Sequence, residues 1–459
     1  MTATEKLKAR SRLPAFLAET RSNVDGTLTS VAENDRHLDL PRGFHDTGPE
    51  AMAVYRTLQQ EWFDACALAG YQPVDVPPIG FQDTFTTGHN AAGEKLYQFA
   101  DRSGRDFALV SDSLPAILRL AHARGLPEQR LSHCCAVFRY ERRPRRHFHH
   151  LGLVEVVNRP SSLVEQQRST LRIVQLVAGF LGPRRPATFT LTDPGIWHTL
   201  AAEFLPEDDQ AQYLNVLHRL SRADRPSRLR HDGAPAAVVR LAEEFCTDPT
   251  LSDDGKFPVL QELPIAVRRR IDAVHELAAA LRQRAIPADI DLGELHASEF
   301  HDGPSFLIQL QDDHRLLGDG GSYGSFASRF AGKPTSAYSA VIGLERLADL
   351  TTADHNDQRE PAADVAILAQ DEPEARSHAD ILTETLRSAG LHVWDVVLTR
   401  PLRRHLRDLA SLRIPYSVVI GARDLDGATY TIRDQQGVLR RMHREQLIGW
   451  LRSHSPSIK

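Results

Sequence analysis

The sequence predicts an α+β fold in which an antiparallel sheet flanked by helices carries a helical insertion and precedes a small α/β domain. Three observations lead to this prediction. Residues 96–141 contain short segments in which polar and apolar residues alternate, as they do in antiparallel strands. Residues 162–285 have mainly helical periodicity. From residue 363 onward, strand-like and helical segments alternate in the βαβαβ order of a parallel sheet.

The chain has 459 residues, which is enough for two or three domains. Residues 1–40 are polar and irregular and are predicted to be an N-terminal extension. Residues 41–350 are predicted to form the sheet domain with its helical insertion. The charged, proline-containing stretch at 351–362 is predicted to be a linker, and residues 363–459 to be the α/β domain.

The first element of the sheet domain is predicted to be a helix that ends near Gly70. Its apolar residues recur at three- and four-residue intervals and share one face: Met52, Tyr55, Leu58, Trp62, Cys66 and Ala69. The segment that follows, YQPVDVPPI, combines prolines with β-branched residues, which suits an edge or interface strand. Because this strand is apolar and poorly suited to exposure, we expect a homodimer joined through the helix and the strand.

The composition excludes several classes of protein. Hydrophobic residues make up 41% and charged residues 25% of the chain, and no apolar run approaches the ~18 residues that cross a bilayer. The four cysteines form no CxxC pair, which argues against a zinc knuckle and favours the reducing cytoplasm. The net charge of −5 gives no general attraction to nucleic acid, so any RNA contact would come from local basic patches.

The most informative segment is CAVFRYERRPRRHFHHLGLVEV, residues 135–156. A strand ending at Arg139 and Glu141, an arginine-rich loop and a returning strand place several guanidinium groups beside one sheet surface. Arginine suits phosphate because its planar fork donates two parallel hydrogen bonds and stays charged. On its own the segment would indicate only an exposed basic hairpin. However, the apolar segment AVIGLERLADL also carries Arg346, which needs an anionic partner in a protein carboxylate or a ligand phosphate.

These two segments resemble motifs 2 and 3 of the class II aminoacyl-tRNA synthetases, and the sequences that flank them resemble the histidyl-tRNA synthetase family. PRGFHDTGPEAM is similar to the opening of that family, GYQPVDVPPI to its dimer-forming motif 1, and LYQFADRSGRDFAL to the strands that follow. GDGGSYGSF resembles its glycine-rich substrate strand, and VVIGARDLDGATYTIRD its anticodon-binding module. The order of these motifs over residues 40–455 is more specific than any one of them.

The resemblance implies an ATP-binding site. Arg139 would bind the α-phosphate, Glu141 would accept a hydrogen bond from the adenine amino group, and Phe148 would stack on the base. Arg346, with Arg145 or Arg146, would hold the bent triphosphate. A substrate carboxylate would attack the α-phosphorus, while arginines and Mg²⁺ neutralise the developing charge, so no protein nucleophile is needed. Arg139 and Arg346 would therefore be the catalytic residues.

The departures from the family fall where it recognises histidine. The family's Arg-Pro-Glu-Gly-Thr segment is here VSDSL, which keeps a carboxylate at Asp112 for an ammonium group. The position of a catalytic arginine holds His296 and that of a tyrosine His301, while the family's glutamine corresponds to His150. Glu155 lies one residue beyond the expected glutamate, and Gly-Gly-Arg-Tyr-Asp becomes a segment containing Ser322 and Tyr323. A site rewritten in this way should disfavour an imidazole substrate by about 10⁴.

We therefore expect an adenylate-forming ligase that uses ATP and Mg²⁺ to activate an amino acid other than histidine and passes it to tRNA or another acceptor. The alternative is a non-catalytic regulatory or binding subunit, because LVSDSLPAILRL and DLGELHASEFHDG also resemble the regulatory subunit of ATP phosphoribosyltransferase. The retained phosphate arginines favour the ligase, and the lost substrate arginine favours the regulatory subunit.

Three further features have simpler interpretations. A metal site at His147, His149 and His150 is disfavoured, because the first two share one strand face and the third points away. Cys134 and Cys135 are expected to be packing residues. The basic stretch RLSRADRPSRLRH, residues 219–231, is expected to be a solvated loop.

Overall fold

A computed structural model of the chain describes the residues in eight ranges: 38–87, 95–141, 145–247, 257–296, 300–311, 314–353, 361–425 and 429–455. The predicted N-terminal extension at 1–40 lies almost wholly outside these ranges. The predicted linker at 351–362 begins within a helix that runs to Ala353, and its residues 354–360 also lie outside them. Within the described ranges, no helix is both long enough and apolar enough to cross a membrane.

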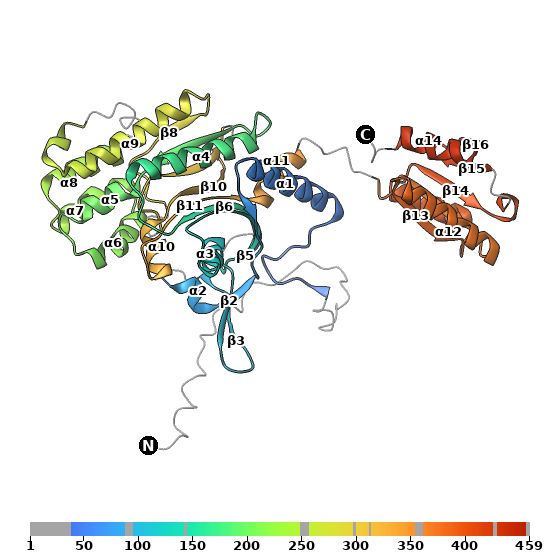
Figure 1. Cartoon of the computed structure of the whole chain (residues 1–459), viewed down its shortest axis with the longest axis horizontal. Coiled ribbons are helices and arrows are strands. Elements are labelled where there is room, and N and C mark those ends of the chain that lie inside the picture. Colours follow the sequence, from blue (N-terminus) through green and yellow to red (C-terminus); the bar gives the residue numbers. More distant parts are fainter. Residues whose placement is uncertain are drawn as a thin grey trace, which may run out of the picture. The chain divides into compact units, whose positions relative to one another are not determined.

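The centre of the sheet domain is an eight-stranded sheet (Figure 1). Its six inner strands pair antiparallel, as predicted, whereas the outermost strand at each edge pairs parallel to its neighbour. From edge to edge the strands are β1 (Gln72–Pro73), β5 (Glu128–Phe138), β6 (His147–Val157), β11 (Ser336–Gly343), β10 (Leu316–Ser322), β9 (Ser305–Leu310), β7 (Ala187–Thr192) and β8 (Ala288–Ile290).

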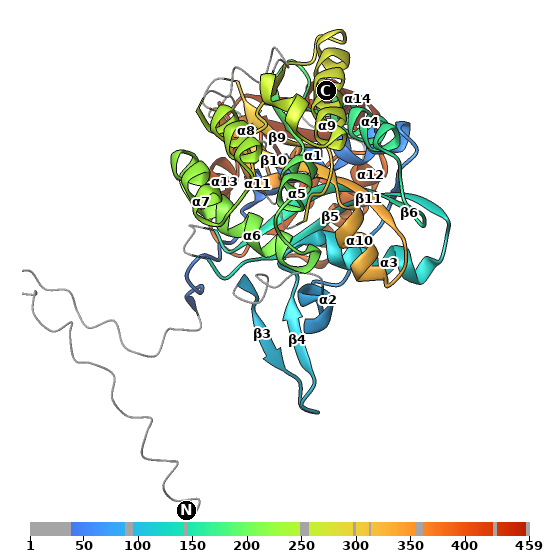
Figure 2. The same cartoon turned by 90° about the vertical axis from the view of Figure 1, so that its left-hand side faces the viewer.

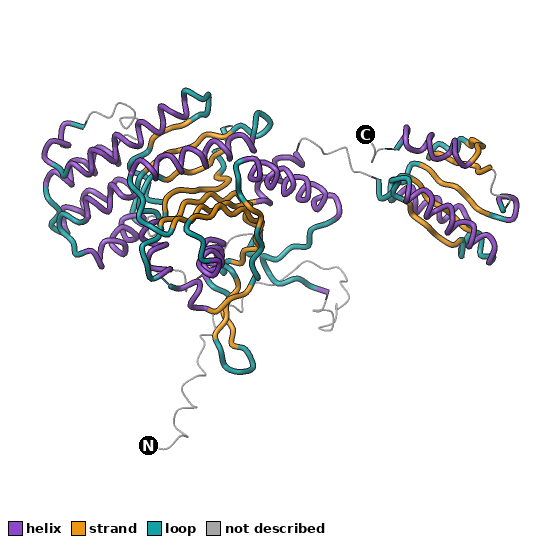
Figure 3. The backbone as a smooth tube through the Cα atoms, in the orientation of Figure 1, coloured by secondary structure: helices purple, strands orange, loops and turns teal. Residues whose placement is uncertain are grey.

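Helices pack on both faces of this sheet (Figure 3). One core contains buried residues of α1 (Pro49–Leu68), α4 (Leu163–Leu181) and α9 (Ile265–Arg282), and the other contains residues of α3 (Ser113–Arg124) and α10 (Gly324–Ala331). Helix α1 buries Tyr55, Leu58, Trp62 and Cys66, as its periodicity predicts, whereas Met52 is exposed. The two faces of the sheet therefore have separate hydrophobic cores.

The insertion is mainly helical, as predicted, but it also contains a strand, β7. Helices α5 (Pro194–Ala201), α6 (Glu207–Arg219), α7 (Arg225–His231), α8 (Ala236–Thr247) and α9 lie together (Figure 1). Strand β7 lies within the stretch predicted to be helical and pairs with β9 in the main sheet. Sequence periodicity missed it, because the segment ATFTLT is short and lies between two helices, α4 and α5.

The prediction of a solvated loop at residues 219–231 is wrong. After the last residue of α6, these residues form a 3-10 turn (Arg222–Asp224) and helix α7. Arg222 donates to Asp291 at 2.5 and 2.9 Å and to Glu294 at 3.1 Å. Arg225 is buried and donates to the carbonyl oxygens of Leu217 and Gly293. The arginines thus tie the insertion to residues 291–294, because their guanidinium groups have partners that a loop in water would not supply.

A second, three-stranded sheet projects from the domain (Figure 2). Its strand order is β2 (Ile79–Phe81), β4 (Asp106–Leu109) and β3 (Gln98–Ala100), and helix α2 (Gln82–Thr86) follows β2. Phe107 lies opposite both Phe81 and Phe99, with ring centroids 5.1 and 6.2 Å away. Phe81 and Phe99 are 55% and 45% exposed, so this sheet carries a row of partly uncovered aromatic rings.

The C-terminal part has its own sheet and hydrophobic core. The predicted βαβαβ series is present as β12 (Val365–Ala369), α12 (Pro373–Ser388), β13 (Val393–Val397), α13 (Leu402–Ser411) and β14 (Tyr416–Ile420). Strands β13, β12 and β14 are parallel, as predicted. The sheet then continues antiparallel through β15 (Thr429–Asp434) and β16 (Leu439–His443), before helix α14 (Arg444–His454).

The Arg222 ion pairs should stabilise the sheet domain. We expect Arg222→Ala to lower the free energy of unfolding by about 2 kcal/mol, because Asp291 and Glu294 would lose a half-buried cation. Arg230→Ala is the matched control, since Arg230 makes an exposed pair with Glu243 and should cost less than about 0.5 kcal/mol. Urea unfolding followed by circular dichroism measures both. Equal losses would show that the Arg222 pairs do not anchor the insertion.

Candidate functional site

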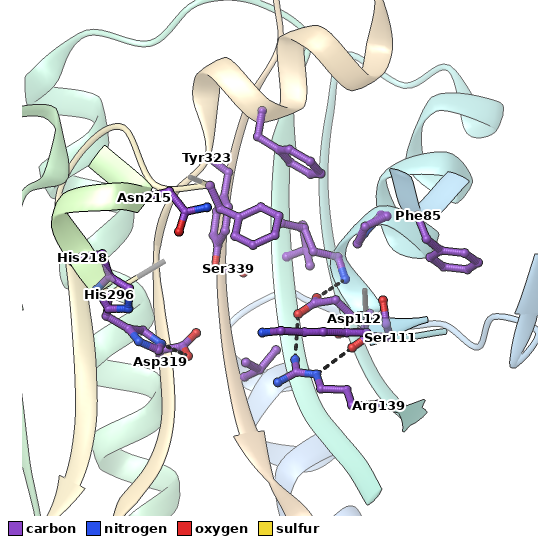
Figure 4. A pocket seen from close by; sticks show the side chains of 18 of the residues that line it. Phe85, Ser111, Asp112, Arg139, Asn215, His218, His296, Asp319, Tyr323 and Ser339 are labelled. Carbon is purple, nitrogen blue, oxygen red and sulfur yellow. Dashed lines mark hydrogen bonds and ion pairs between the residues drawn. The ribbon is translucent and has the colours of Figure 1, made fainter. Parts of the chain in front are cut away.

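Three central strands form the floor of a cavity of about 460 Å³ (Figure 4). Val154 of β6 lies opposite Ser339 of β11, and Val341 of β11 lies opposite Asp319 of β10. All four side chains line the cavity. Because side chains alternate along a strand, residues two apart on β11 face the same side, and their partners on both neighbours face it as well.

The N-terminus of α3 forms one end of the cavity. Asp112 caps this helix by accepting a hydrogen bond from the Leu114 backbone N–H at 3.0 Å. Arg139, just beyond β5, donates through Nε to the Ser111 carbonyl oxygen at 2.8 Å and through a terminal nitrogen to Asp112 at 3.2 Å. Its guanidinium group also lies 5.5 Å from the ring centre of Phe148. Within the described residues these two hydrogen bonds use two of its five N–H groups, which leaves three for a ligand.

The other end of the cavity is built by the insertion and by β10. Helix α6 contributes Asn215, His218 and Arg219, and the loop after β8 contributes His296. Figure 4 shows His218, His296 and Asp319 on one side of the cavity and Ser111, Asp112 and Arg139 on the other. The remaining walls are largely apolar and come from Phe85, Leu114, Pro115, Phe300, Tyr323 and Phe326.

His296 and Asp319 form a pair within the cavity, with His296 Nε2 3.2 Å from the Asp319 carboxylate. Burial alone would raise the pKa of Asp319, but the hydrogen bond from His296 and the nearby imidazoles of His301 and His150 lower it below its ordinary value. Asp319 is therefore ionised at neutral pH. Burial and the charge on Asp319 together raise the pKa of Tyr323 well above its ordinary value, so this side chain remains a neutral phenol.

Two neutral histidines lie beside the cavity, on the same face of the sheet as Val154. Burial lowers the pKa of His150 to about 4, and its Nδ1 lies 3.3 Å from the Ser113 hydroxyl. Burial also lowers the pKa of His133 to about 3. The His133 ring fills the space over Gly152, where any side chain would collide with it. Neither imidazole carries a positive charge at neutral pH, so neither neutralises the carboxylates of the cavity.

The structure brings together four of the predicted site residues as lining of one cavity: Arg139, Asp112, His296 and Tyr323. His150 and Phe148 lie next to it, His150 against Ser113 and Phe148 against Arg139. His301 and Ser322 lie behind Tyr323: His301 is buried, its ring centre is 4.3 Å from that of Tyr323, and its Nδ1 is 3.3 Å from the Ser322 carbonyl oxygen. Burial lowers the pKa of His301 as well.

The other residues predicted to bind ATP do not line the cavity. Glu141 pairs with Lys95 at 3.3 Å, and its carbonyl oxygen accepts from Arg146. Arg145 interacts with the Tyr55 hydroxyl, and it partly offsets the rise in the pKa of Tyr55 that burial causes. Arg346 donates to the Leu316 carbonyl oxygen at 3.0 Å. Their roles toward ATP stay predictions. Arg142 and Arg143 of the same loop lie outside the described residues.

Glu155 does not reach the cavity, although it was predicted to belong to the amino-acid pocket. It is buried on the opposite face of β6, where Arg172 donates to it at 2.5 and 2.8 Å and the Tyr71 hydroxyl at 2.5 Å. The cavity-facing residue at this point is Val154. The extra residue between Gly152 and Glu155 explains the difference, because a shift of one residue on a strand reverses the face.

Sequence reasoning missed several lining residues. Asp319 lies within the glycine-rich segment GDGGSY, and strand alternation from Tyr323 through Gly321 would have placed it on the same face. Ser339 and Val341 could have been found in the same way on β11. Asn215, His218 and Arg219 gave no local signal, because only the tertiary packing of the insertion brings α6 to the cavity.

The described residues contain no group of three or more His, Cys, Asp and Glu side chains arranged to hold a metal ion. His149 instead pairs with Glu345, with its Nδ1 2.8 Å from one carboxylate oxygen and its backbone N–H 2.9 Å from the other. Burial raises the pKa of the Cys134 and Cys135 thiols to about 11 and about 12, which makes them poor nucleophiles.

Comparison with known proteins agrees with the fold and the motifs. The sequence model of the family described as "Histidyl-tRNA synthetase" matches residues 43–347, and that described as "Anticodon binding domain" matches residues 364–454. The chain is 25% identical to a histidine–tRNA ligase of Thermococcus kodakarensis, an alignment that covers 87% of this chain and 94% of the relative. It is 23% identical to a histidine–tRNA ligase of Listeria innocua, again covering 87% and 94%.

Solved structures share the fold at lower identity. The histidyl-tRNA synthetase of Nostoc sp. PCC 7120 superposes with a TM-score of 0.69 at 16% identity, covering 91% of this chain and 99% of that one. A protein of Bacillus halodurans, described as an ATP phosphoribosyltransferase regulatory subunit/histidyl-tRNA synthetase, has a TM-score of 0.64 at 16% identity, covering 83% and 97%. At these identities the likeness concerns the fold alone.

Asp112 has two separable roles, in capping α3 and in pairing with Arg139. We expect Asp112→Ala to lower the free energy of unfolding by about 1 kcal/mol, because the Leu114 N–H would lose its partner. Asp112→Asn should stay within about 0.5 kcal/mol of the unaltered protein, because asparagine caps a helix as well as aspartate. Thermal or urea unfolding compares the two variants. Equal destabilisation by both would mean that the charge pair, not the cap, is the stabilising contact.

Proposed function

The chain belongs to the histidyl-tRNA synthetase family, and on that premise we propose that it uses ATP to activate an amino acid other than histidine as an aminoacyl-adenylate. The observation that carries this proposal is Arg139, oriented by Ser111 and Asp112 at the end of a cavity large enough for a small molecule. A guanidinium group fixed in this way is preorganised for a phosphate or carboxylate oxygen. The adenylate would be passed to tRNA or another acyl acceptor.

In the proposed reaction, a carboxylate oxygen of the amino acid attacks the α-phosphorus of ATP. The bond from that phosphorus to its bridging oxygen breaks, and the electron pair leaves with pyrophosphate. The free N–H groups of Arg139 would bind the oxygens on which charge develops, and Asp112 would accept from the substrate ammonium group. Mg²⁺, which favours phosphate oxygens, would neutralise charge on the triphosphate. In this proposal Arg346, Arg145 and Arg146 remain candidates for the β- and γ-phosphates.

The floor and the rim of the cavity argue against histidine as the amino acid. Val154 offers no hydrogen bond at the position where the family's spacing expects a glutamate. His296 stands in place of the family's arginine, and its imidazole is paired with Asp319. His301, in place of a tyrosine, is buried behind Tyr323. When a site lacks the groups that hydrogen-bond a polar substrate, its preference for that substrate over others falls by orders of magnitude.

A tRNA acceptor is supported by the C-terminal part. Its match to an anticodon-binding domain is accompanied by three exposed arginines on α13, namely Arg403, Arg404 and Arg407. Guanidinium groups in such a cluster suit the RNA backbone, and they supply the local positive charge that the net charge of −5 does not. Smaller acyl acceptors are the alternative within the same reaction.

The second candidate function is a non-catalytic regulatory subunit. It is favoured by the replacement of the family's catalytic arginine by His296, whose ring is already engaged with Asp319. A protein of this kind would bind a small molecule in the cavity without consuming ATP. Pyrophosphate exchange therefore separates the two functions.

We also propose a homodimer, supported by the apolar groups that the single chain leaves exposed. Ile79 and Phe81 of β2 are 40% and 55% exposed; Ile79 ends the proline-rich segment that resembles the family's dimer-forming motif, and Phe81 follows it. Phe99 extends the same row of rings through Phe107. A contiguous aromatic surface of this kind is typical of a protein interface.

Mg-ATP should bind to the unaltered chain and bind at least tenfold more weakly to Arg139→Ala, because the loss of a charge-assisted contact costs about 1.5–3 kcal/mol. Arg346→Ala tests the second proposed phosphate contact in the same way, and Arg240→Ala is the control, because Arg240 lies on an exposed face of α8. Isothermal titration calorimetry gives the affinities. If the unaltered chain binds no Mg-ATP, or if Arg139→Ala binds it equally well, the phosphate assignment is wrong.

The reaction is tested by ATP–pyrophosphate exchange with a panel of amino acids. We expect exchange with at least one amino acid or close analogue, little or none with histidine, and a large loss in Asp112→Asn. Robust exchange with histidine would contradict the rewritten pocket. Mg-ATP binding without exchange across the whole panel would favour the regulatory function.

The dimer should depend on the aromatic row of the small sheet. Phe81→Glu would place a charge in a desolvated interface and should shift the protein to a monomer at micromolar concentration. Ile381→Glu is a matched control, because Ile381 is also 55% exposed but lies on α12 of the C-terminal part. Sedimentation velocity reports the mass of both variants. A monomeric unaltered protein would overturn the proposal.

A further inference from the structure

The cavity has a second charged end that the adenylate chemistry does not use. Asp319 lies on β10 between two glycines, Gly318 and Gly320, at which a side chain would collide with the backbone of β11. The two strands therefore approach closely, and the backbone that carries Asp319 is held in a fixed place. Its side chain is 26% exposed, and that exposed surface faces the cavity.

The two cavity carboxylates differ in their partners. Asp112 is paired with the guanidinium group of Arg139 at 3.2 Å. In the part of the chain that is described, Asp319 has no lysine or arginine partner, and its ion-pair contact is with His296. The carboxylate at one end of the cavity is therefore paired with a guanidinium group, whereas the carboxylate at the other end has an imidazole as its ion-pair partner. Arg219 of α6 lines the same end, but among the described residues it forms no ion pair with Asp319.

Two of the surrounding histidines, His150 and His301, do not neutralise this carboxylate. His150 and His301 face Asp319 from β6 and from the loop before β9, and burial lowers the pKa of both. Each ring is therefore neutral at pH 7. A partly buried carboxylate is stabilised by a cation, since a lower local dielectric than that of water strengthens the attraction.

The space between the two ends suits the carbon chain of a substrate. Val154, Val341 and Tyr323 line it with apolar surface, and Tyr323 stays a neutral phenol. A long aliphatic stem can lie along such surface while its charged end reaches a polar group. An acidic side chain would be repelled by Asp319, and an uncharged one would leave the carboxylate without a cation.

We infer that the amino acid activated by this chain has a cationic side chain, an ammonium or guanidinium group, that pairs with Asp319 while its α-ammonium group pairs with Asp112. This inference rests on the proposed function and specifies its substrate class. Lysine, ornithine and arginine belong to that class. Free histidine does not, because its imidazole is largely uncharged above pH 7.

The test is pyrophosphate exchange at pH 8 with lysine, ornithine and arginine, against norleucine, glutamate and histidine. At least one cationic amino acid should give a kcat/KM at least about 10-fold above that of every other member of the panel. Asp319→Asn, which keeps the shape of the side chain and removes its charge, should lower this kcat/KM about 10- to 100-fold, the loss expected for one charge-assisted contact. Asp289→Asn is the control, because Asp289 is exposed on the edge strand β8.

Calorimetry with Mg-ATP separates a wrong substrate class from a wrong function. Asp319→Asn should bind Mg-ATP as tightly as the unaltered chain, which also shows that the variant is folded. If Mg-ATP binds but exchange is confined to neutral or acidic amino acids, is absent with all cationic ones, or is undiminished in Asp319→Asn, the cationic class is wrong and the proposed function is judged separately. If the unaltered chain binds no Mg-ATP and exchanges with no amino acid, the proposed function itself is wrong.

Discussion

The alternation of side chains across β6, β11 and β10 determines what the site can contain. On each strand every second residue faces the cavity. The cross-strand pairs Val154–Ser339 and Val341–Asp319 therefore form its floor as a single layer of side chains. The opposite face of the same strands belongs to the hydrophobic core with α1 and α4. A shift of one position moves a side chain to the other face of the sheet. Glu155 illustrates this, because it forms a buried ion pair with Arg172 and does not face the cavity.

Much of this arrangement follows from local pattern, and the remainder depends on contacts between distant segments. The α1 helix, the antiparallel strands and the C-terminal βαβαβ series have clear periodicity, and Asp112 and Arg139 lie in recognisable motifs. Strand β7 has no clear signal, since six alternating residues between two helical segments are ambiguous. Nor does the basic stretch 219–231 reveal its structure, because the carboxylate partners of Arg222 lie about 70 residues away in the sequence.

The electrostatics of the cavity follow from which groups are buried. Burial keeps His133, His150 and His301 neutral, since a charged imidazole would lose its hydration without gaining an equivalent partner. Asp319 remains ionised because His296 donates to it and because its oxygens keep access to the cavity. The result is a site in which one carboxylate, Asp112, is paired with the guanidinium group of Arg139 and the other, Asp319, with the imidazole of His296.

The insertion is part of this site and not an independent appendage. Arg222, just after α6, binds Asp291 and Glu294, and Glu294 in turn accepts a hydrogen bond from the His296 backbone at 2.7 Å. The same network thus positions His296 in the cavity and holds the helix that supplies Asn215, His218 and Arg219 to its wall. Because one set of ion pairs fixes both the wall and the histidine that contacts Asp319, a change in the insertion should alter the choice of amino acid while leaving the Arg139 end intact. In the proposed function, substrate selection and phosphate binding would therefore be carried by different parts of the chain.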